Sequence, residues 1–133
     1  MIRTILILTL LYPTFLFAQN GTASNSNDSV FYIVEKLPEF PGGQEGLIRH
    51  LKQNTKYPAK AKKKKITGKV VVQFMIDTNG RVNMDSASVI EPVHPLLDQE
   101  ALRVVSIMPV WKPGTQRGKP VNVYYKLPFN FKL

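Results

Sequence analysis

The last stretch of the chain, VNVYYKLPFNFKL from Val121 to Leu133, alternates between apolar and mostly polar positions. Successive side chains of a strand point to opposite faces, so this pattern predicts a long, half-buried β-strand. Burying each large apolar side chain is worth roughly 1.5–3 kcal/mol, and a lone strand cannot provide that burial. The rest of the chain must therefore build a sheet beside this strand and helices over it. The apolar face consists of Val121, Val123, Tyr125, Leu127, Phe129, Phe131 and Leu133.

Pro128 lies inside this run and has no N–H group to donate to a neighbouring strand. That part of the strand is therefore expected at a sheet edge, at a bulge or beyond the end of pairing. An edge strand is a surface on which another chain can dock. The alternative is a terminal strand whose proline and lysines only prevent aggregation.

The first 18 residues are typical of a secretory signal peptide. Arg3 precedes an apolar stretch from Ile5 to Phe17, and Ala18 comes before a polar segment. Pro13 and the modest apolar length favour cleavage over a retained membrane anchor. We therefore expect export to the periplasm, and anchoring in the inner membrane if the segment is not cleaved.

A chain of 133 residues allows one domain. The net charge of +9, which falls to +8 without Arg3, indicates anionic partners such as lipid, cell-wall polymer or acidic protein surfaces. We expect no nucleic-acid partner for an exported protein. The lysine-rich run from Lys60 to Lys65 is either a membrane or polyanion contact or simply a solvated helix face. The absence of cysteine excludes disulfides and cysteine-based metal sites.

Between the two ends, hydrophobic periodicity and turn residues predict a mixed order of elements. Asp77 starts the hairpin turn and is expected to have a structural role, and Trp111 is expected to close the core. The predicted elements are a brief strand at Val30–Val34, a helix at Gln44–Asn54, a basic helical turn from Ala59, a hairpin over Gly68–Ile90 and a helix at Pro95–Met108.

No constellation of catalytic or metal-binding residues is visible in the sequence. His50 and His94 are the two histidines, and neither has a cysteine or a spaced histidine as partner. No nucleophile motif, phosphate loop or dinucleotide glycine pattern occurs. We therefore expect no enzyme activity, no catalytic residues, no metal site and no cofactor.

Several of these segments resemble the C-terminal domain of TonB, in the form found in Bacteroidetes-type members. The similarity lies in the order and spacing of the motifs. The matching stretches are FPGG at Phe40–Gly43, YPAKA at Tyr57–Ala61, GKVVVQFMIDTNGRV at Gly68–Val82, LDQEA at Leu97–Ala101, MPVWKPG at Met108–Gly114, GKPV at Gly118–Val121 and the FKL ending at Phe131–Leu133.

The resemblance implies an α+β fold with two helices packed on one face of a three-stranded antiparallel sheet, the C-terminal strand lying at the edge. Together with the signal-peptide pattern, this divides the chain into a signal peptide at 1–18, a leader with a possible short strand at 19–34 and the TonB-like domain at 35–133. It also implies that the TonB box of an outer-membrane transporter docks on the edge strand. The implied partner-binding residues are Val121, Asn122, Val123, Tyr124, Tyr125, Lys126 and Leu127.

Two functions remain open at this point. The first is a periplasmic energy transducer that binds the TonB box and reaches an inner-membrane motor complex through another subunit. The second is an unanchored periplasmic interaction module, for example a homodimer. The second arises because the apolar N-terminal stretch contains no histidine and the spacer from Gln19 to Ser29 could reach only about 40 Å.

Overall fold

A computed structural model describes residues 29–133 of the chain. The predicted signal peptide at 1–18 and most of the predicted leader lie outside the described residues. Within the described part, no helix is both long enough and apolar enough to cross a membrane.

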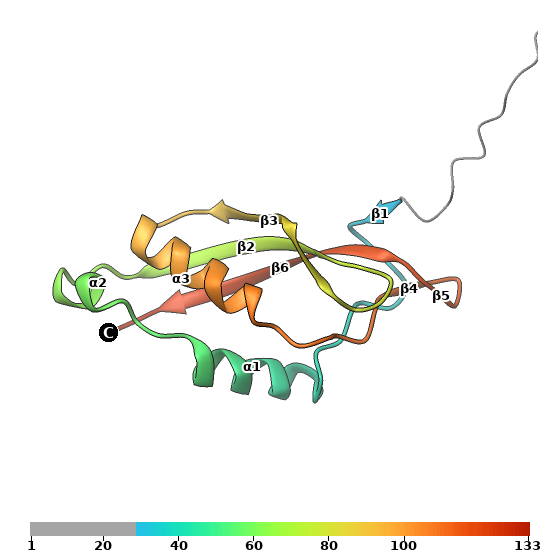
Figure 1. Cartoon of the computed structure of the whole chain (residues 1–133), viewed down its shortest axis with the longest axis horizontal. Coiled ribbons are helices and arrows are strands. Elements are labelled where there is room, and N and C mark those ends of the chain that lie inside the picture. Colours follow the sequence, from blue (N-terminus) through green and yellow to red (C-terminus); the bar gives the residue numbers. More distant parts are fainter. Residues whose placement is uncertain (1–28) are drawn as a thin grey trace, which may run out of the picture.

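The centre of the fold is a four-stranded sheet in the order β1-β6-β2-β3 (Figure 1). The strands are β1 at Val30–Phe31, β2 at Gly68–Ile76, β3 at Val82–Glu91 and β6 at Asn122–Phe131. The long strands β2, β3 and β6 are antiparallel, whereas β1 runs parallel to β6. A separate two-stranded ribbon consists of β4 at Thr115–Gln116 and β5 at Lys119–Pro120.

The alternation in the C-terminal stretch predicts β6 correctly except at its ends, since the strand spans Asn122–Phe131 and Leu133 is 62% exposed. Val123, Leu127, Phe129 and Phe131 are each at most 4% exposed, whereas the side chains between them are exposed or half-buried. β6 pairs with β2 without interruption from Val123, opposite Ile76, to Phe131. One face of the sheet is therefore covered and the other faces solvent.

Helices cover the apolar face. Helix α1 spans Gly43–Asn54, α2 spans Ala59–Lys63 and α3 spans Pro95–Ser106. α3 lies against β2 and β3, and its buried stripe is the one the spacing predicts. That stripe consists of Leu97, Ala101, Val104 and Val105.

Trp111 closes the core, as expected, and is only 3% exposed. Its ring contacts Phe40, Phe74 and Tyr125 at centroid distances of 5.3, 6.2 and 5.0 Å. Phe40 precedes α1, Phe74 lies on β2 and Tyr125 on β6, so this aromatic cluster joins three parts of the chain.

The expected three-stranded antiparallel sheet with the C-terminal strand at its edge is wrong in detail. A fourth strand, β1, pairs in parallel with Asn122 and Val123 and so covers the start of β6. The expected pair of helices becomes three, because Pro58 separates α2 from α1. The long turn before β6 also contains the β4-β5 ribbon. These differences depend on pairing between distant residues, which local patterns do not specify.

Candidate partner-binding site

β1 covers only the first two residues of β6, so the outer edge of β6 is unpaired from Tyr124 onward within the described chain. Tyr32, just after β1, stacks on Tyr124 at a centroid distance of 4.9 Å. After this contact the chain turns away, and Lys36 pairs with Thr115. The open edge therefore starts where the Tyr32–Tyr124 stack ends.

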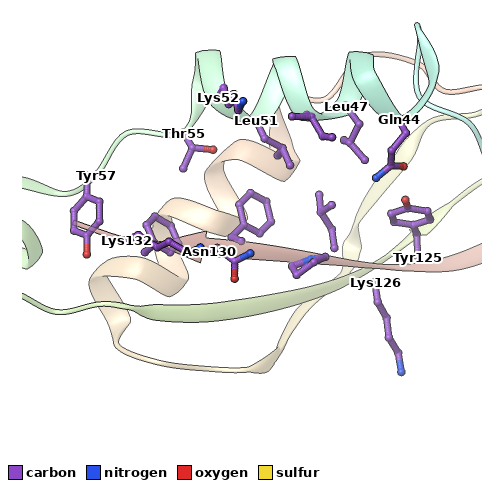
Figure 2. Close-up of a pocket in the computed structure, with 15 residues that line it drawn as sticks. Gln44, Leu47, Leu51, Lys52, Thr55, Tyr57, Tyr125, Lys126, Asn130 and Lys132 are labelled. Atoms are coloured by element: carbon purple, nitrogen blue, oxygen red, sulfur yellow. The ribbon is translucent and has the colours of Figure 1, made fainter.

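A groove of about 490 Å³ lies between α1 and this open edge. Every residue from Tyr125 to Lys132 lines it on the sheet side, and α1 supplies the opposite wall (Figure 2). Figure 2 shows Leu47 and Leu51 pointing from α1 towards β6, whereas Lys126 points away from the groove. Lys126 therefore borders the groove through its backbone.

Tyr125 and Tyr57 mark the two ends of the groove (Figure 2). Burial raises the pKa of the Tyr125 hydroxyl above its ordinary value. Its ring is only half-buried, so Tyr125 belongs both to the aromatic cluster and to the groove wall. Tyr57 donates a hydrogen bond to the Ile66 carbonyl and packs edge-on against Phe131 at 5.7 Å.

Three side-chain polar atoms in residues 29–133 are buried without a hydrogen-bond partner. They are Oγ1 of Thr55, which lines the groove, Nε2 of His50 and Nε1 of Trp111. Nδ1 of His50 lies 3.2 Å from the Asn54 side-chain amide, and burial lowers the pKa of His50.

The other residues that the sequence singled out have structural roles. Oδ1 of Asp77 accepts hydrogen bonds from the amides of Asn79 and Arg81, each at 2.9 Å. His94 caps α3 by accepting a hydrogen bond from the Leu96 amide at 3.1 Å. Among residues 29–133, no group of three or more metal-ligating side chains comes together.

Residues 53–133 match the family model described as Gram-negative bacterial TonB protein C-terminal. The chain belongs to this family. TonB C-terminal domains are non-catalytic, of the periplasmic type, associated with energy transduction in transport, and they interact with outer-membrane transporters in general. Neither the curated proteins nor the solved structures include a match to the chain.

The seven residues expected to form the docking edge of this TonB domain fall into two groups. Tyr124 to Leu127 lie on the open edge of β6. The first three do not, since the Val121 amide donates to the Gly114 carbonyl and β1 pairs with Asn122 and Val123.

The sequence did not indicate the α1 wall of the groove. The stripe of Leu47, Ile48 and Leu51 reads as a core-facing helix face, and Leu47 is indeed buried. The one signal in the sequence was that the apolar stripe of α1 is wider than the part that the core buries. Ile48, at the side of this stripe, remains 44% exposed and lines the groove. Most of α1 also precedes residue 53, where the family match begins.

Proposed function

We propose that this domain binds an extended segment of an outer-membrane transporter, the TonB box, by strand addition to the open edge of β6, and so supports energy-dependent uptake. The observation that carries the proposal is the unpaired edge from Tyr124 onward beside a largely apolar groove. Strand addition obtains affinity from backbone hydrogen bonds and selectivity from alternate side chains.

Pro128 indicates which amides of β6 are available. It lies opposite Val71 in the middle of the β2-β6 pairing. A proline inside a ladder is tolerated where its nitrogen points away from the neighbouring strand. By alternation, the amides of Tyr124, Lys126 and Asn130 then point to the open edge as well.

The groove supports a segment with alternating apolar side chains. A strand added beside β6 would turn every second side chain towards Leu47 and Leu51, on the same face as Leu127 and Phe129. The segment would therefore fill apolar surface and gain backbone hydrogen bonds together.

The other long edge of the sheet, on β3, is less suited to docking. Its pairing with β2 is irregular between Gln73 and Met75. Opposite this irregularity, Ser86 donates to the Asn83 carbonyl and accepts from the Met75 amide, so the strand is locally bent. Bulged edges of this kind protect a sheet against strand addition.

The test is titration of peptides from transporter N-terminal segments against the domain and two variants at one position. Lys126→Pro removes an outward amide, whereas Lys126→Ala removes only the side chain. A net hydrogen bond is worth about 0.5–1.5 kcal/mol, so we expect the proline variant to bind about two- to tenfold more weakly. The alanine variant should bind like the wild type, apart from a small electrostatic change.

Unfolding curves of both variants show whether the fold is kept. Equal peptide affinity of a folded Lys126→Pro variant would refute docking on this edge. Absence of binding by the wild type to every transporter segment would refute the function itself.

A second function, an interaction module that pairs with itself, is favoured by the same edge. An unpaired strand can add to its copy across a two-fold axis. In that case sedimentation would show a concentration-dependent dimer that Lys126→Pro disrupts.

The proposal also includes cleavage of the chain after residue 18, a TonB-like domain at residues 35–133 and contact with a motor complex through another subunit.

A further inference from the structure

In one continuous part of the chain, every charged side chain is basic. Residues 46–76 contain nine lysines and arginines and no aspartate or glutamate. Five of these lysines lie on α2 and the turn that follows it, and all five side chains are exposed. We call them the α2 lysines: Lys60, Lys62, Lys63, Lys64 and Lys65.

No carboxylate of the described chain forms an ion pair with the α2 lysines. Glu91 lies 3.8 Å from Lys69, and Glu100 pairs with Arg103 at 2.6 Å. Glu100 also accepts a hydrogen bond from the Lys56 amide at 2.9 Å. The carboxylates of these neighbouring elements are thus engaged elsewhere, and the charge of the α2 lysines stays uncompensated.

The fold holds these charges together despite their mutual repulsion. Lysines three or four residues apart on a helix destabilise it. Packing offsets this cost, because Ala61 is completely buried and its carbonyl accepts a hydrogen bond from the Ile66 amide at 2.9 Å. The Tyr57 hydroxyl donates a hydrogen bond to the Ile66 carbonyl and so fixes the same turn. A surface selected only for solubility would mix both signs of charge.

The α2 lysines lie at one end of the molecule. Figure 1 shows α2 and the C-terminus at one end of the long axis, with β4 and β5 at the other. None of the α2 lysines lines the groove between α1 and β6. A partner at this end would therefore leave the groove accessible.

We propose that the α2 lysines dock the domain on the anionic phospholipid headgroups of a membrane. Helix α2 has only five residues, and successive positions of a helix are rotated by about 100° about its axis, so the lysines do not converge on one small anion. A membrane surface instead presents many headgroups at once, and its potential extends over about one Debye length, roughly 8 Å. This role is separate from segment docking on β6.

The experiment measures cosedimentation of the protein with phosphatidylcholine vesicles that contain about a third phosphatidylglycerol. The test variant replaces all five α2 lysines by glutamine. The matched control removes the same charge at exposed positions away from α2, with Lys36→Gln, Arg81→Gln, Lys112→Gln, Arg117→Gln and Lys119→Gln.

Each basic residue at an anionic surface contributes about fivefold in partitioning, and we expect about three of the five to face the membrane at once. The α2 variant should therefore partition about 100-fold more weakly, and the control a few-fold at most. Added salt should weaken wild-type binding, and pure phosphatidylcholine vesicles should not bind.

Equal losses in the two variants would mean that only net charge matters and would overturn the proposal. So would a wild type that binds soluble polyphosphate but not vesicles. Thermal unfolding checks the fold, and the α2 variant should be at least as stable as the wild type because the repulsion is gone. The double variant Lys63→Gln/Lys64→Gln provides a milder test and should show an intermediate loss.

Discussion

Gly80 is the residue at which the β2-β3 turn meets Trp111. The Trp111 amide donates to the Gly80 carbonyl at 2.7 Å, and Gly80 has a φ of +80°. A Cβ atom at this position would lie 1.7 Å from the Trp111 carbonyl oxygen. The glycine therefore serves two purposes, a left-handed turn and close contact between two backbones.

Replacing Gly80 by alanine should lower the free energy of unfolding by at least about 3 kcal/mol, because strain and a backbone clash add together. Gly118→Ala is the matched control, since Gly118 also has a positive φ of +74° but no atom of residues 29–133 lies within 4 Å of its added Cβ. Backbone strain alone should cost the control about 1 kcal/mol. Similar losses in urea unfolding of the two variants would contradict the contact with Trp111.

His50 makes folding sensitive to mild acid. Its Nε2 is buried without a partner in the described chain, and burial lowers its pKa below the ordinary value of 6.5. The unfolded chain therefore binds a proton at higher pH than the folded chain does. This contribution to stability is complete above about pH 6.5 and is lost as the pH falls towards the folded pKa.

We expect the free energy of unfolding to fall as the pH drops below about 6.5, the ordinary pKa of histidine. The fall should be smaller in His50→Gln, which does not titrate there. Denaturant unfolding at several pH values measures the difference. Parallel pH profiles for wild type and variant would show that His50 is not the group responsible.

At the scale of elements, β1 limits where a partner strand can start. It pairs only with Asn122 and Val123, and its own residues are not among those that form the core. Replacing Val30 and Phe31 by glycine and serine should therefore leave the domain folded. It should also lengthen the open edge by two residues.

We therefore predict that this β1 variant binds a long transporter segment several-fold more tightly than the wild type does. One or two further backbone hydrogen bonds, each worth about 0.5–1.5 kcal/mol, supply the gain. A peptide too short to reach Asn122 should bind both proteins equally. Weaker binding of the long peptide would mean that β1 supports the docked strand rather than limiting it.

Local patterns predicted the elements whose partners are close in sequence or whose faces are strongly marked. The stripe of α3, the β2-β3 hairpin and the alternation of β6 all follow from residue periodicity. β1 shows the limit, because the residues Val30–Val34 suggested a short strand but could not indicate that its first two residues pair in parallel with β6. The groove was beyond prediction for the same reason, since α1 and β6 are about 80 residues apart along the chain.

At the scale of the whole molecule, the two proposed surfaces lie on different parts of one hydrophobic core. The groove runs beside β6. Helix α2, which carries most of the α2 lysines, lies at one end of the long axis (Figure 1). The core beneath joins them, since Tyr57 both lines the groove and holds the turn after α2. Membrane contact at α2 should therefore leave the open edge of β6 accessible.

The final prediction is that both ligands bind at once. Transporter peptide should bind vesicle-bound domain with the same affinity as free domain, within about twofold, because neither ligand covers residues used by the other. Fluorescence anisotropy of a labelled peptide, measured with and without anionic vesicles, tests this. The α2 variant serves as the control, since vesicles should not affect its peptide binding. Competition between vesicles and peptide on the wild type would mean that the membrane covers the β6 edge, and that α2 orients this edge towards the lipid.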